Sequence, residues 1–262
     1  MSGGPPRGVA LALHQYRYDQ RQFWREPASV FFTVVLPLIF LFLFVSIFGN
    51  EDVRVGGSQI SFANYYLPGI LTLALTSATF VNLTITLTIL RERGELKRVR
   101  ATPVPTWVII AGRTLTAVGV TAVMVVVLMA IGAIFYGVEV PTTTLPAAVI
   151  ALLVGVVALS ALGFAFAAVV PSENAAPPMS NAVVLPLYFI SGVFIPSDQT
   201  PAWMDTVAGV FPVKPLFEAL LRAFDPNTFG AGFDWSHLAV VAAWGVGGAL
   251  FALSRFRWMP RG

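Results

Sequence analysis

The stretch that decides the fold of this 262-residue chain runs from residue 67 to residue 105 and reads LPGILTLALTSATFVNLTITLTIL followed by RERGELKRVRATPVP. The first of these two segments carries no charged residue, whereas residues 91–100 carry five basic side chains and two glutamates. A bilayer core about 30 Å thick requires roughly 20 apolar residues in a helix that crosses it. The stretch therefore predicts a membrane-spanning helix that leads into a charged loop.

The composition of the whole chain also indicates an integral membrane protein. Hydrophobic residues make up 56% of the sequence and charged residues 11%, with a mean hydropathy of +0.78, whereas a soluble domain has about 25% charged residues. The absence of cysteine excludes disulfides and thiolate metal sites, and the two histidines, His14 and His237, lie too far apart in sequence to suggest a metal centre. The net charge of +3 is grouped in a way that reports membrane orientation, so no nucleic-acid partner is expected.

Six apolar runs predict six spanning helices within one transmembrane domain, residues 1–262. The runs are residues 29–49, 67–90, 107–136, 146–170, 179–195 and 238–254. The first run follows a polar segment and has no small-residue cleavage site after it, so we expect a retained span and not a signal peptide. Pro68 is expected in the first turn of its span, and Pro37 and Pro186 are expected to kink theirs. The predicted fold class is therefore all-α.

The basic residues predict the orientation of these spans. Of the 16 arginines and lysines, twelve fall before the first run, between the second and third runs, or after the sixth, and Arg113 lies near the start of the third run. Cytoplasmic loops of membrane proteins carry the excess of basic residues. We therefore expect both termini in the cytoplasm and a cytoplasmic segment at residues 91–105.

Residues 196–224, between the fifth and sixth runs, are apolar but interrupted by prolines and charges. They predict two short helices, around residues 201–211 and 215–224, and Glu218 and Arg222 are spaced for an i,i+4 ion pair. Neither helix is long enough to cross a bilayer. We expect a re-entrant or surface helical hairpin on the outer face.

An amphipathic helix is predicted at residues 8–27, before the first span. Arg17, Arg21 and Arg25 recur on one face, while Leu13, Tyr16, Phe23 and Trp24 share another. This pattern is typical of a helix that lies in the membrane interface. Periodicity alone leaves two roles open for Arg17, Arg21, Trp24 and Arg25, anchoring to anionic lipid and docking of a partner.

Two polar stripes are candidates for a route through the membrane. One follows the second span and the other the fifth, and together with an adjacent aromatic residue they give the candidate residues Thr79, Asn82, Thr86, Asn181, Tyr188, Phe189 and Ser191. Such stripes often pack helices together through hydrogen bonds, and the alternative is that they line a mostly apolar cavity. The sequence leaves both interpretations open.

The segment RERGELKRVRATPVPTWVIIAGRTL (91–115) resembles the region between spans two and three in the membrane component of type-2 ATP-binding-cassette transporters. The residues that match the family's pattern are Glu92, Arg93, Gly94, Glu95, Leu96, Ala101, Thr102, Pro103, Gly112 and Arg113. NYYLPGIL (64–71) and LPLYFISGVFIPSDQTPAWM (185–204) resemble two further segments of these proteins. The drug-resistance permeases of the daunorubicin-exporter type are the most similar subgroup.

This resemblance implies a cytoplasmic coupling helix at residues 91–105 that docks on a separate ATPase subunit. The implied docking residues are Arg91, Glu92, Arg93, Gly94, Glu95, Leu96, Lys97, Arg98, Thr102 and Pro103. It also implies a permease homodimer or heterodimer with two ATPase subunits, alternating access, and an outer gate in the hairpin that includes Pro196, Pro201, Trp203 and Pro212. Arg113 is expected to extend toward the cytoplasmic interface.

The expected function is ATP-driven export of a drug or lipid by a subunit that is not itself an enzyme. The chain has no G-x-x-x-x-G-K-[ST] phosphate loop, so ATP and Mg²⁺ are expected on the partner. Export of a polysaccharide or glycolipid is the alternative within the same superfamily. An ion-coupled carrier would place ionisable residues inside the membrane, and here the acidic residues fall in loops or at span ends. A channel, an intramembrane enzyme and a membrane scaffold are further classes that the sequence supports less well.

Overall fold

The computed structural model describes residues 7–55, 58–95, 106–139, 141–195 and 200–255. Most of these residues are helical. The elements are α1 (Arg7–Arg25), α2 (Pro27–Val30), η1 (Phe31–Val35), α3 (Leu36–Phe48), β1 (Asp52–Val55), β2 (Ser58–Ser61), α4 (Phe62–Thr76), η2 (Ser77–Val81), α5 (Asn82–Glu92), α7 (Thr106–Tyr136), α8 (Leu145–Val169), α9 (Ala176–Ile190), α10 (Ala202–Val210), α11 (Val213–Phe224) and α12 (Trp235–Arg255). The fold class predicted from the sequence is confirmed.

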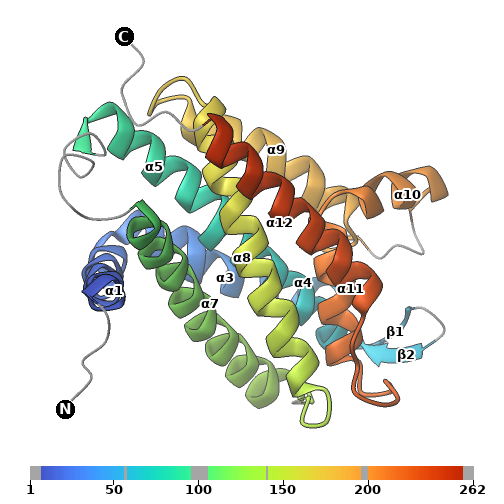
Figure 1. Ribbon diagram of the computed structural model, residues 1–262. Helices are drawn as coiled ribbons and strands as arrows, with labels where there is room; N and C mark the ends of the chain where they lie inside the picture. The colour runs from blue at the N-terminus through green and yellow to red at the C-terminus, as the bar shows by residue number, and fades with distance from the viewer. Residues whose placement is uncertain (1–6, 56–57, 96–105, 140, 196–199, 256–262) are drawn as a thin grey trace, which may run out of the picture.

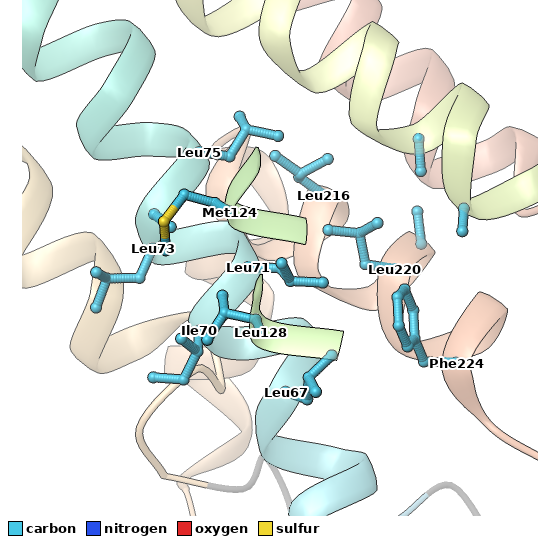
Figure 2. Close-up of a cluster of buried hydrophobic side chains, with 14 of the residues drawn as sticks. Leu67, Ile70, Leu71, Leu73, Leu75, Met124, Leu128, Leu216, Leu220 and Phe224 are labelled. Atoms are coloured by element: carbon cyan, nitrogen blue, oxygen red, sulfur yellow. The ribbon is translucent and has the colours of Figure 1, made fainter. Parts of the chain in front are cut away.

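One continuous helix, formed by α4, η2 and α5, lies at the centre of the bundle. It runs from Phe62 to Glu92 and is mostly buried, although its composition would suit a helix exposed to lipid. Figure 2 shows side chains of α4, among them Leu67 and Leu71, against Met124 and Leu128 of α7 and Leu216 and Leu220 of α11. The helix that carries the charged loop is therefore the core of the domain.

The six predicted spans correspond to six apolar helical stretches, four of which are long enough by themselves to cross a bilayer. These four are Phe62–Glu92, Ala111–Tyr136, Leu145–Val169 and Trp235–Arg255. The apolar part of the first predicted span is Thr33–Phe48, and the fifth, Ala176–Ile190, has only 15 residues. At 1.5 Å per residue, the fifth helix is about 22 Å long, shorter than the roughly 30 Å bilayer core.

The prolines are accommodated in different ways. The π-helical segment η1 precedes Pro37, and the backbone N–H of Leu36 donates to the carbonyl of Phe31, five residues earlier. This wider turn makes room next to a ring that would clash with an ordinary helical turn. Pro68 is not in the first turn as predicted, because the Ser61 side chain caps the helix and starts it at Phe62.

The predicted outer hairpin is present as two short helices, but α11 is not a surface helix. It packs against α4, α8 and α12 (Figure 1), and Leu216 and Leu220 are fully buried. The expected pair between Glu218 and Arg222 is wrong. Glu218 lies 3.4 Å from Lys214, one turn earlier, and Arg222 lies 3.6 Å from Asp234 at the start of α12.

The loop between the first two spans contains a β-hairpin that we did not predict. The strands β1 and β2 pair antiparallel, with Val53 opposite Ile60. The alternating sequence DVRV-GG-SQIS carries the signal, because a Gly-Gly pair between two short alternating runs is typical of a tight hairpin. The hairpin packs on the start of α4 and buries Ile60.

Candidate functional site

The charged segment begins where the central helix ends. Its last helical residue is Glu92, and Gly94 adopts a φ of +68°, a conformation that glycine reaches without strain. The N–H of Gly94 donates to the carbonyl of Arg91 at 3.1 Å. The chain therefore changes direction at Gly94, and Glu95 is exposed just beyond it. The other predicted docking residues, Leu96, Lys97, Arg98, Thr102 and Pro103, lie outside the described residues.

Arg91, which we predicted to dock the ATPase, has a different environment. It is 1% exposed, so it offers no docking surface. Its Nη1 and Nη2 atoms donate to the carbonyls of Ala167 and Val170, each at 2.7 Å. These carbonyls are at the C-terminal end of α8, where helix carbonyls lack intrahelical partners and a positive charge is favourable. Arg91 therefore caps α8.

The next two residues contact the turn between α8 and α9. Glu92 accepts a hydrogen bond from the N–H of Glu173 at 2.9 Å. Arg93 is mostly exposed, and its Nε lies 3.8 Å from the Glu173 carboxylate, a surface pair of small energetic value. Three consecutive residues at the start of the charged segment therefore contact the same neighbouring helix end and turn.

A buried ion pair connects the N-terminal helix to α7. Arg113 Nε lies 3.3 Å from Asp19 Oδ2, and the Asp19 side chain is almost fully buried. Burial raises the pKa of Asp19, and Arg113 and a hydrogen bond from Gln15 offset only part of that effect. Arg113 therefore pairs with α1 instead of extending to the interface as predicted. An isolated acid in α1 and an isolated arginine in a long apolar run were the sequence signal for this pair.

Helix α1 packs on α7, whereas a purely interfacial helix would bury its apolar face in lipid. Ala12, Asp19 and Phe23 are buried, and Gln20 donates to the carbonyl of Thr116 in α7. Gly119 of α7 leaves the space that Gln20 and Tyr16 occupy. The four interface residues Arg17, Arg21, Trp24 and Arg25 are exposed on the remaining surface, with Trp24 held by a bond from Nε1 to Gln20.

The candidate residues for a membrane route fall into two groups. Thr79, Tyr188 and Ser191 are buried, and their hydroxyls bond to the carbonyls of Leu75, Leu73 and Tyr188 respectively. The Tyr188 bond joins α9 to α4 and so contributes to helix packing, whereas the Thr79 and Ser191 bonds stay within their own part of the chain. The other group is accessible: Asn181 and Phe189 are exposed on α9, and Asn82 and Thr86 are half-buried and bond to each other.

An apolar groove of about 500 Å³ lies among α8, α9, α12, η2 and the start of α11. Its lining comprises Thr76, Phe80, Leu159, Leu162, Ala165, Phe166, Val169, Ala182, Val183, Val184, Pro186, Leu187, Ile190, Phe211, Pro212, Val213, Trp244 and Phe251. Among these described lining residues, only Thr76 and Trp244 have polar side-chain atoms, and Trp244 Nε1 donates to the carbonyl of Val210 at 2.6 Å. The sequence did not reveal this groove, because its residues come from five separate segments.

The predicted outer-gate residues are divided between the surface and this groove. Pro201 and Trp203 are exposed at the start of α10, Pro212 is buried and lines the groove, and Pro196 lies outside the described residues. The ring of Phe211 stacks on Trp244 of α12 with a centroid distance of 6.0 Å. The junction of α10 and α11 therefore forms part of the wall of the groove.

A charged cluster that the sequence analysis missed connects α11 and α12 near this junction. His237 lies 2.7 Å from Glu218 through Nε2 and 2.8 Å from Asp234 through Nδ1, and Lys214 pairs with both Glu218 and Asp205. Burial alone would raise the pKa of Asp234, but hydrogen bonds from Ser236 and His237 outweigh it, so the pKa lies below its usual value. These contacts connect α11 to the start of α12.

The chain is similar to known membrane transport proteins. The family model described as "ABC-2 type transporter" matches residues 15–224. A protein of Porphyra purpurea named "Putative transport permease ycf38" is 28% identical over 230 residues, which cover 86% of this chain and 76% of the relative. A protein of the same name from Cyanophora paradoxa is 22% identical over 236 residues, covering 90% and 76% respectively. Because the family match extends over most of the chain, the protein belongs to the ABC-2 type transporter family of membrane permeases.

Proposed function

We propose that this chain is the membrane subunit of an exporter of the daunorubicin-resistance type, driven by a separate ATP-binding-cassette ATPase. The observation that carries the proposal is the position of the charged segment. It follows directly from the buried central helix Phe62–Glu92, so a force applied at residues 91–105 acts on the core of the permease. ATP and Mg²⁺ belong to the partner in this proposal, and the assembly contains two permease chains and two ATPase subunits.

Docking is proposed to use the accessible charges of the segment. Glu95 and Arg93 are exposed, and the segment continues with Leu96, Lys97, Arg98, Thr102 and Pro103. Charge-assisted hydrogen bonds made by acidic and basic side chains are strong enough to hold a docking element while the partner moves as a rigid body. Glu92 is expected to contribute less to docking, because one of its carboxylate oxygens already accepts a hydrogen bond from the N–H of Glu173.

Reversing the charge at Arg98 is expected to release the ATPase. The wild type and Arg98→Glu are solubilised from native membranes, and the ATPase that co-purifies is measured by its activity. Arg255→Glu, at the exposed end of α12, is the matched control and should retain the partner. Equal recovery of the ATPase with the wild type and with Arg98→Glu would show that Arg98 does not contribute to docking. If no ATPase co-purifies with the wild type, the proposed function is refuted.

The proposed cargo is a hydrophobic or amphipathic molecule, such as a drug or lipid. The apolar lining of the groove supports this class over a polysaccharide, because sugar hydroxyls would lose hydrogen bonds to water without replacing them there. The proposed route combines the groove with the accessible residues Asn82, Thr86, Asn181 and Phe189. Closure at Phe211, Pro212 and Trp244 forms the outer gate.

Filling the groove is expected to reduce the response to cargo. Leu187 lines the groove, so Leu187→Trp should diminish the stimulation of ATPase activity by an added anthracycline several-fold. Leu185, two residues earlier in α9, is 49% exposed and does not line the groove, which makes Leu185→Trp the matched control. The same response from both variants would argue against the groove as a cargo site.

The proposed orientation places both termini on the cytoplasmic side of a bacterial cell membrane. Because the chain has no cysteine, a single introduced cysteine can report its own side of the membrane. A cysteine replacing Asp52, exposed in β1, should react with an impermeant maleimide in intact cells. One replacing Lys97 should react only after the membrane is opened. The reverse pattern would invert the topology.

A further inference from the structure

We infer that Arg91 transmits the movement of the docking segment to α8 and α9, and does not itself contact the ATPase. The inference rests on the proposed function, because it assumes that an ATPase pulls on residues 91–105. It assigns a positioning role to a side chain that the sequence pattern places among the docking residues.

The guanidinium of Arg91 is suited to holding two helices together. It donates through two nitrogens to two carbonyls, Ala167 and Val170, that lie on either side of the end of α8. A planar fork with several donors can satisfy both carbonyls at once, whereas a lysine presents a single charged point. A displacement of Arg91 must therefore move the end of α8 or break two charge-assisted hydrogen bonds.

The adjoining residues extend this connection to α9. Glu92 holds the N–H of Glu173, and the carbonyl of Glu173 accepts from the N–H of Ala176, the first residue of α9. The turn between the two helices is therefore attached to the end of the central helix. A movement at Arg91 and Glu92 reaches the beginning of α9 as well as the end of α8.

Close packing along α5 and α8 makes this connection stiff. Thr84 donates to the carbonyl of Gly163 at 3.2 Å, and a Cβ at Gly163 would lie only 3.0 Å from the Phe80 carbonyl. The continuous helix η2–α5 and helix α8 therefore approach at backbone distance where Gly163 faces Phe80 and Thr84. Because α8 and α9 supply most of the groove lining, the movement of α8 and α9 changes the shape of the groove.

The test uses the full chain with its ATPase in lipid nanodiscs and a spin label in the turn between α8 and α9. Asn174 is exposed in that turn, and the chain has no cysteine, so Asn174→Cys gives a single labelling site. The two measurements are the amount of ATPase that co-purifies and the change in the label's spectrum when ATP and vanadate are added. Arg91→Gln is compared with Arg91→Lys and with Thr88→Val. Thr88 is equally buried, but its hydroxyl bonds to Thr84 within α5.

Arg91→Gln is expected to retain the ATPase and to lose the nucleotide-dependent spectral change. Arg91→Lys should fold and reduce the spectral change without abolishing it. Thr88→Val should give the same spectral change as the labelled protein that carries no further substitution. Loss of the ATPase from Arg91→Gln would make Arg91 a docking residue and overturn the inference, as would an unchanged spectral response. If no ATPase accompanies even the wild type, the proposed function fails, and this is seen before any Arg91 variant is compared.

Discussion

Replacing Gly245 by leucine is expected to push α12 away from α8 and to destabilise the folded protein by about 3 kcal/mol, at the upper end of the cost of overpacking a core. A Cβ at Gly245 would lie 2.8 Å from both the Cα and the Cβ of Ala158. Because the obstacle includes the α8 backbone, no change of side-chain rotamer relieves it. Membrane helices approach this closely only where small residues face one another.

Gly247→Leu provides the matched control, two residues further along the same helix. A Cβ at Gly247 meets nothing within 4 Å, and replacing glycine inside a helix can favour the helix by up to about 1 kcal/mol. The measurement is the thermal unfolding of both variants in detergent. A clear fall in the midpoint for Gly245→Leu alone supports the described crossing of α8 and α12, and equal midpoints would contradict it.

Replacing Arg113 by methionine is expected to cost about 3–5 kcal/mol of stability, the usual cost of leaving one member of a buried ion pair without its partner. The partner is Asp19, whose side chain is 2% exposed. In the variant, the carboxylate has lost its counter-charge and, among the described residues, keeps only the hydrogen bond from Gln15 at 2.9 Å. Unfolding of the purified protein in detergent measures this loss, and α1 should detach from α7 before the bundle unfolds.

The cost of Arg113→Met should depend on pH. Burial raises the pKa of Asp19 above its ordinary 3.8 in the folded protein, so the folded state binds a proton more tightly than the unfolded state. Stability contributed by this group therefore falls as pH rises from 3.8 through the raised pKa. Arg113 lowers the pKa of Asp19, so in Arg113→Met this pKa is higher and Asp19 stays protonated and uncharged to a higher pH. The stability lost in Arg113→Met should therefore be smaller at about pH 5 than at about pH 8. The double variant Asp19→Asn, Arg113→Met has no carboxylate here and should lose this pH dependence.

Patterns of consecutive residues predicted most of the helices of this fold. Apolar runs identified the spans, and the prolines and charges of residues 196–224 identified two short helices where α10 and α11 are found. The sequence also suggested the family through residues 91–115, and the family match confirms that suggestion. The β-hairpin was within reach as well, since Gly56 and Gly57 stand between two alternating runs.

The same patterns could not assign partners to individual polar residues. Arg91 and Arg93 are two positions apart in one charged run, yet one is buried against α8 and the other is mostly exposed. Likewise, Thr79 and Asn82 belong to one predicted stripe, but Thr79 is fully buried and Asn82 is half-buried. Which residues on a helix contact a given neighbouring helix depends on how the helices pack. The periodicity of the sequence does not specify that packing.

The sequence by itself determined that this chain is a helical membrane protein and where most of its helices and its charged segment lie. These properties follow from the transfer of consecutive side chains into the bilayer and from local backbone preferences, so they can be read from neighbouring residues. Only the tertiary structure decided that Arg91 caps α8, that Asp19 pairs with Arg113, and that five segments form an apolar groove. Each of these depends on contacts between residues far apart in the chain, and such contacts exist only once the helices have packed.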